Sequence, residues 1–227
     1  MTSITRTRIT RLVAALVAVL AAALVAGALG GSHGAAAQGK AQVKRPVSQA
    51  ELAFRNEMRR LWEDHIVWTR LAIVSLTTDA PDTEATVGRL LRNQDEIGAA
   101  IAPFYGAAAG DELARLLRDP IVIAAELVAA ARAGDAEAVA DAQARWGANA
   151  DEIAAFLAAA NPRAWDEAVL RASLEEHLRM TTDEAVARLT GDWEADVAAY
   201  DAIHAHILGF ADVLSTGIVR QFPGRFR

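Results

Sequence analysis

The sequence contains no cysteine, only six prolines, and 6% aromatic residues. Without cysteine the chain has no disulfide bond, no thiolate metal ligand and no cysteine nucleophile. Its formal net charge is −6 and no basic block follows the N-terminal segment, which argues against nucleic acid as a partner. Alanine and leucine are abundant instead, and both favour helix. A chain of 227 residues is long enough for one domain with a sizeable core.

The first 37 residues have the pattern of a targeting segment. Three arginines among the first eleven residues precede an uncharged apolar run at 12–29, and small-residue motifs follow at 26–28 and 35–37. This order is typical of a cleaved signal peptide, which predicts export to the cell envelope or the medium. A retained membrane anchor is the alternative, because the apolar run is nearly long enough to span a bilayer. Residues 38–47 resemble a linker.

Local start and stop signals predict six helices within a single domain at 48–222, followed by a tail at 223–227. Ser48 with Glu51 three residues later forms a capping-box pattern, and glycine–aspartate pairs mark the end of one helix and the start of the next. The expected helices are 48–77, 82–102, 111–133, 135–160, 164–190 and 192–222.

The six helices form three pairs that resemble one another. A shift of 57 residues places Pro120 on His177, Gly134 on Gly191 and Asp135 on Asp192. The first pair matches the second more loosely. This pattern predicts an all-α bundle of about six long antiparallel helices, built as three repeated hairpins that stack to bury their apolar faces.

Most of the predicted inward-facing stripes carry one polar residue near the middle. In the last helix, the stripe begins with Trp193 and Val197. The helix at 111–133 has Pro120 at the central position, where we expect a kink and a Leu116 carbonyl that is free or bound to water. The central polar residues are His65, Gln94, Asn149, His177 and His204.

Three interpretations of this polar layer stay open. The side chains could bond to one another and fix the register of the helices, because an unpaired buried polar group costs about 1–3 kcal/mol. They could bind a divalent metal or haem through His65, His177 and His204. They could also line an unspecialised cleft or partner surface. If a site requires a histidine in every hairpin, Pro120 leaves it incomplete.

Several stretches resemble a family of exported bacterial helical proteins of unknown function: "LWEDHIVWTR", "LLRNQDEIG", "WGANADEIAAFLAAANP", "HLRMTTDEAVARL" and "ADVLSTGIVRQF". The resemblance covers about residues 58–223 and implies an all-helical fold and export, but no activity. Family members usually have histidine where this chain has Pro120. Some are labelled glycosyltransferases or kinases, yet this sequence has no glycine-rich phosphate loop and no alternation of strands and helices.

The sequence therefore predicts an exported, non-catalytic helical binding or interaction module without a cofactor. No residue is assigned a catalytic role, because no ionisable pair is evident in a conventional arrangement. The partner is expected in the cell envelope or outside the cell, and membrane contact only through an uncleaved N-terminal segment. A metal- or haem-binding bundle that uses the core histidines is the alternative.

Overall fold

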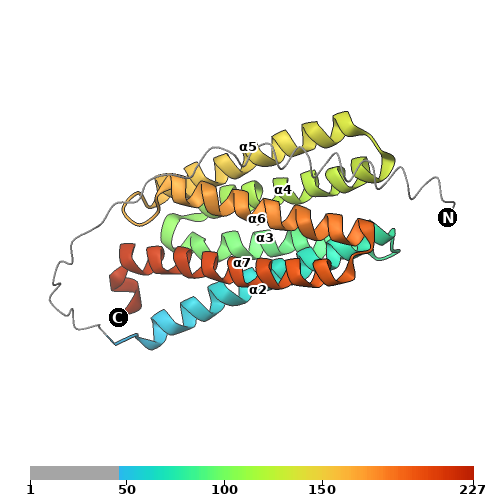
Figure 1. Ribbon diagram of the computed structural model, residues 1–227. Helices are drawn as coiled ribbons and strands as arrows, with labels where there is room; N and C mark the ends of the chain where they lie inside the picture. The colour runs from blue at the N-terminus through green and yellow to red at the C-terminus, as the bar shows by residue number, and fades with distance from the viewer. Residues whose placement is uncertain (1–45) are drawn as a thin grey trace, which may run out of the picture.

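The computed structural model describes residues 46–227, which form an all-helical domain with no strand in that range (Figure 1). The signal-peptide prediction and nearly all of the predicted linker lie outside the described residues. The helices are α2 (Gln49–Thr78), α3 (Thr83–Tyr105), α4 (Ala107–Ala133), α5 (Ala136–Ala160), α6 (Glu167–Thr190) and α7 (Trp193–Gln221), followed by the 3₁₀ turn η1 (Pro223–Phe226).

The helix ends follow the signals in the sequence. The Ser48 hydroxyl accepts a hydrogen bond from the backbone N–H of Glu51 at the start of α2. Gly134 and Gly191 end α4 and α6 with φ angles of 79° and 76°, a left-handed conformation that glycine adopts at little cost. Asp135 and Asp192 follow directly and cap α5 and α7. The predicted stop-and-start pairs are thus confirmed.

The largest boundary difference lies between α3 and α4. The sequence placed a break at 103–110, whereas α3 continues through Pro103 to Tyr105 and α4 begins at Ala107. Only Gly106 connects the two helices, with a φ of 91°. Further along, Gly98 of α3 faces Gly110 of α4 so closely that a Cβ atom on Gly98 would lie 2.3 Å from the Gly110 carbonyl oxygen. These glycines permit the close packing of α3 on α4.

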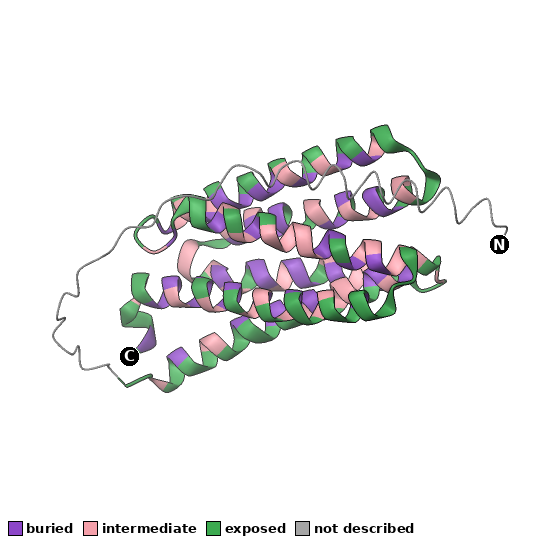
Figure 2. Cartoon of the chain, viewed as in Figure 1, coloured by how far each residue is buried: buried purple, intermediate pink, exposed green. Residues whose placement is uncertain are grey.

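The six helices form a ring in contact order. Each helix packs against the helices before and after it in the sequence, and α7 returns to pack against α2 (Figure 1). The helix α2 also touches α4 and α6. Buried residues lie on the inward faces and exposed residues on the outward faces (Figure 2). The described part of the chain therefore has one main core, enclosed by the helices.

Aromatic side chains close one end of the ring. Phe54 of α2 packs against Phe104 of α3 and Phe226 of η1, with ring centroids 5.1 and 5.2 Å apart. The Ser48 hydroxyl donates to the Phe226 carbonyl oxygen at 2.7 Å. Phe226 is only 3% exposed, so the predicted C-terminal tail is part of the core.

The opposite end of α7 departs from the predicted stripe. Trp193 and Val197 were expected to face inward, but they are 58% and 53% exposed. Trp193 lies instead against the guanidinium of Arg188, 5.0 Å from its ring centroid. Among the described helices, α7 alone is long and apolar enough to cross a membrane, judged by length and composition. Half of the apolar stretch that meets this criterion is buried inside the structure.

Candidate ligand-binding cavity

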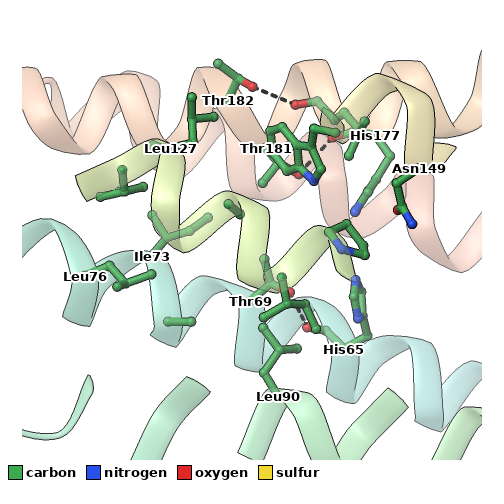
Figure 3. A pocket seen from close by; sticks show the side chains of 18 of the residues that line it. His65, Thr69, Ile73, Leu76, Leu90, Leu127, Asn149, His177, Thr181 and Thr182 are labelled. Carbon is green, nitrogen blue, oxygen red and sulfur yellow. Dashed lines mark hydrogen bonds between the residues drawn. The ribbon is translucent and has the colours of Figure 1, made fainter. Parts of the chain in front are cut away.

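A cavity of about 120 Å³ lies inside the ring, mainly between α2, α4, α5 and α6 (Figure 3). Its inner end, near the middle of the helices, is lined by Trp62, His65, Asn149 and His177 together with the apolar side chains Leu117, Ile153, Leu174 and Ile207. Its other end, which we call the mouth, is lined by the half-buried side chains Leu76, Ala131, Val186 and Leu189, close to where α2, α4 and α6 end. These three helix ends lie at the same end of the molecule (Figure 1).

Two histidines face each other at the inner end. His65 of α2 and His177 of α6 point toward one another, and Asn149 of α5 lies beside His177 (Figure 3). The imidazole centroids are 5.9 Å apart. Burial lowers the pKa of His65 to about 4 and, together with the nearby imidazoles, lowers that of His177 to about 3. Both rings are therefore neutral at pH 7.

The hydrogen bonds of Gln94 determine the tautomer of His65. The Gln94 amide nitrogen lies 2.8 Å from the Leu90 carbonyl oxygen and 3.2 Å from the Asn93 side-chain oxygen, so these acceptors fix the orientation of the amide. The same nitrogen lies 3.2 Å from His65 Nδ1. An amide nitrogen can only donate, so this contact is a hydrogen bond when Nδ1 accepts and the proton of the neutral ring is on Nε2, with the two amide protons shared among three acceptors. His65 thus offers one N–H donor on its other side.

One type of hydrogen bond recurs between the two helices of each pair. A polar side chain of the second helix donates a hydrogen bond to a backbone carbonyl of the first helix. The residue with this carbonyl lies four positions before the histidine or proline at the centre of the first helix. The bonds, 3.0, 3.1 and 3.0 Å long, run from Asn93 to Leu61, from Asn149 to Leu116 and from His206 to Ser173.

This bond explains how the protein accommodates Pro120. Proline has no backbone N–H and cannot donate to the Leu116 carbonyl. The Asn149 amide takes over as the donor to that oxygen. The predicted free or water-bound carbonyl is therefore wrong, and α4 continues through Pro120 as one helix.

Four side chains that line the cavity carry a buried polar atom without a hydrogen-bond partner in the described part of the chain. The atoms are the indole nitrogens of Trp62 and Trp146, the amide oxygen of Asn149 and Nδ1 of His177. The two indoles can only donate and the amide oxygen can only accept. Each unpaired buried polar group costs about 1–3 kcal/mol of stability. The four unpartnered atoms around one cavity therefore indicate that a ligand or solvent forms hydrogen bonds with them.

Between the inner end and the mouth the lining is mainly apolar, apart from the Trp146 indole. Three threonines reach the cavity, but each hydroxyl donates to the carbonyl four residues earlier in its own helix. The hydroxyl protons are therefore already used. No Asp, Glu, Lys or Arg occurs among the described residues that line the cavity. The apolar lining includes Ile73, Val87, Leu90, Ala124, Leu127 and Val128.

No protein-family model, curated protein or solved structure matches this chain. The chemistry of the site must therefore be argued from its own geometry. The resemblance to exported helical proteins stays a prediction.

The structure brings four of the five predicted polar residues together and separates the fifth. Gln94 bonds to His65, and His65, Asn149 and His177 line the cavity. His204 does not line it, and its Nε2 lies 3.4 Å from Glu63 on the outer surface of the bundle. A different histidine, His206, stacks on His177 at 6.1 Å between centroids. Residues that are two positions apart on a helix point to nearly opposite sides, so the predicted stripe that contains His204 could not also contain His206.

A buried charge cluster ties α2, α6 and α7 together near the mouth. Arg70 donates to Glu184 at 2.7 Å and also pairs with Asp196, while Arg188 donates to Asp196 at 2.9 Å. The pKa of Asp196 lies below its ordinary value. Burial alone would raise it, but the hydrogen bonds from Arg70 and Arg188 outweigh this effect. Burial raises the pKa of Glu184 despite its bond to Arg70. The cluster fixes α6 against α2 where the cavity opens.

Proposed function

We propose that the protein is an exported, non-catalytic binding module whose ligand occupies the cavity between α2, α4, α5 and α6. The concentration of unpartnered buried polar atoms around one internal cavity carries this proposal. A cavity with a few polar groups in an apolar lining is the usual form of a small-molecule site. The volume of about 120 Å³ suits a small or slender ligand, since an engineered cavity of about 150 Å³ binds benzene.

The chemistry of the lining favours binding over catalysis. A general acid or base works best with a pKa near the working pH. Burial keeps the pKa values of His65 and His177 at about 4 and about 3, and no carboxylate among the described lining residues accompanies them. These imidazoles therefore suit hydrogen bonding to a ligand in their neutral form.

The proposal includes the origin of the cavity in three antiparallel hairpins derived from one unit. The recurring side-chain-to-carbonyl bond supports this origin, because it occurs once in each pair of helices at corresponding positions. In the second pair proline replaces histidine at the central position, and Asn149 still makes the bond. If the three copies then diverged, the buried polar groups that line the cavity would remain in only some of the six helices.

Export rests on the N-terminal pattern of arginines, apolar run and small residues. N-terminal sequencing of the protein from the medium or cell envelope tests it. A mature chain that begins near Gln38 or Leu29 supports cleavage, and an intact Met1 in the membrane fraction supports an anchor instead.

The binding proposal is tested by filling the cavity. Ala124 lines it and is half-buried, so Ala124→Phe should occupy part of its volume. Ala129→Phe is the matched control, because it adds the same ring on an exposed face of the same helix. We expect toluene, octane or 1-octanol to raise the Tm of the parent and of Ala129→Phe, but not of Ala124→Phe. If none of the three probes raises the Tm of the parent, the cavity is not a binding site for such molecules.

A divalent metal is a second candidate, which the row of imidazoles His65, His177 and His206 favours. No group of three potential metal ligands of suitable geometry occurs among residues 46–227, so the rings would have to turn. The site would hold neutral imidazoles at about 2.1 Å from a zinc ion. Thermal unfolding with EDTA and with added Zn²⁺ decides: metal-dependent stability in the parent that His65→Ala and His177→Ala abolish would establish it.

A further inference from the structure

From the distribution of polar atoms along the cavity, we infer that the ligand is a neutral, single-chain alcohol that binds with its hydroxyl at the inner end and its hydrocarbon chain toward the mouth. This inference rests on the proposed function and specifies the ligand class. It depends on three features of the cavity: its length, the unpartnered polar atoms at its inner end and its lack of charge.

The lining residues describe an elongated cavity. On α2 they extend from Trp62 to Leu76, on α4 from Leu117 to Ala131, and on α6 from Leu174 to Leu189. At a rise of 1.5 Å per residue, steps of fourteen or fifteen residues along a helix correspond to about 21 Å. A small volume spread over this length suits a slender chain better than a fused ring system.

The inner end requires a group that both donates and accepts. Asn149 presents an unpartnered amide oxygen and is 6% exposed, so its acceptor is buried at the cavity wall. His65 presents the N–H on Nε2, His177 presents an unpartnered Nδ1, and the Trp62 indole is a further donor nearby. A hydroxyl donates one hydrogen bond and accepts others, so it can satisfy both kinds of group, whereas a ketone or ether only accepts.

The absence of charge in the lining excludes an ionised head group. Burying an unpaired charge is much more costly than burying a hydroxyl. The described lining offers no cation to a carboxylate and no anion to an amine. The buried arginines near the mouth are already paired with Glu184 and Asp196. A fatty acid anion and an alkylamine should therefore both bind poorly.

A matched series of probes tests this assignment with the purified protein. We expect 1-octanol to bind at least tenfold more tightly than octane or ionised octanoate at pH 8, measured by titration calorimetry. The direction is diagnostic, because a wholly apolar cavity would prefer octane, which has no hydroxyl to desolvate. Lengthening the alcohol from butanol to octanol should tighten binding about fourfold for each methylene that becomes buried.

Two variants locate the hydroxyl. Asn149→Leu and His177→Phe should each reduce the preference for octanol over octane at least tenfold. Because Asn149→Leu also removes the bond to the Leu116 carbonyl and can impair folding, His177→Phe provides the independent test. Thr182→Val is the matched control, since its hydroxyl is bonded within α6, and it should keep the preference.

The outcomes separate this inference from the proposed function. If octane binds as tightly as octanol and His177→Phe changes nothing, the cavity binds ligands but the hydroxyl assignment is wrong, as it would be if ordered water satisfied the polar atoms. If octanoate binds most tightly, the neutral class is wrong. If no probe binds the parent, both the inference and the proposed function fail.

Discussion

Replacement of His177 by phenylalanine should remove a specific part of the pH dependence of stability. The pKa of His177 is about 3 in the folded protein, because the ring is buried and lies near two other imidazoles. The ordinary pKa of about 6.5 applies to the unfolded chain. As the pH falls below about 6.5, the unfolded state takes up a proton that the folded state does not, so the free energy of unfolding decreases.

The linkage relation gives the magnitude. Between pH 8 and pH 5, the unfolded imidazole becomes almost fully protonated while the folded one stays neutral, which corresponds to a loss of about 2 kcal/mol from His177. His65, with a pKa of about 4, should contribute a similar loss of about 2 kcal/mol. Most carboxylates of the unfolded chain titrate below pH 5, so the change in stability between pH 8 and pH 5 comes mainly from the histidines.

Urea unfolding at pH 8 and pH 5, followed by circular dichroism, measures the effect. Comparing variant with parent cancels the contribution of Glu184, whose raised pKa has the opposite sign. His177→Phe should lose about 2 kcal/mol less than the parent. It should also be at least as stable at pH 8, because the unpartnered Nδ1 is gone. His204→Phe, which removes an imidazole outside the cavity, is the control variant. Equal losses in the parent and His177→Phe would show that water reaches the imidazole and that the burial argument is wrong.

Other substitutions test the packing around the cavity by chemical denaturation. Arg70→Met should lower the free energy of unfolding by about 3–5 kcal/mol, because it leaves the buried carboxylates of α6 and α7 without their shared partner. Arg60→Met removes an exposed pair and should lower it by at most about 1 kcal/mol. A small effect at Arg70 would mean that the cluster is hydrated. Gly98→Ala should lower the free energy of unfolding by about 1–3 kcal/mol, because the added Cβ would overlap a carbonyl of α4. Gly88→Ala on the same helix has space for the Cβ and should raise the free energy of unfolding by about 1 kcal/mol. Equal effects at the two glycines would refute the close approach.

The parts of the fold that depend on neighbouring residues were predictable from the sequence. Gly134 with Asp135, and Gly191 with Asp192, mark helix ends because a left-handed glycine and a capping carboxylate act within one turn. Pro103 misled the prediction because α3 continues past it. The exposure of Trp193 could not be predicted, because an apolar stripe does not show how far a neighbouring helix extends alongside it.

The candidate site was predictable only in part. The placement of His65, Gln94, Asn149 and His177 on inward stripes anticipated which polar residues meet. The hydrogen bond from Asn149 to the Leu116 carbonyl, which replaces the bond that Pro120 cannot donate, could not be anticipated. It joins residues 33 positions apart through tertiary packing. Asn93, Asn149 and His206 follow their partner carbonyls by 32, 33 and 33 residues, and this nearly equal spacing was the signal that could have identified His206.

The central claim is that the cavity holds a small ligand in the native protein. Native mass spectrometry of the protein purified from the cells that produce it tests this claim most directly, with the parent compared with Ala124→Phe and Ala129→Phe. We predict that the parent and Ala129→Phe carry the same bound small molecule, that organic extraction releases a neutral alcohol, and that Ala124→Phe lacks it. A parent protein with only the mass of its chain, or an adduct that Ala124→Phe retains in full, would contradict the assignment of this cavity as the binding site.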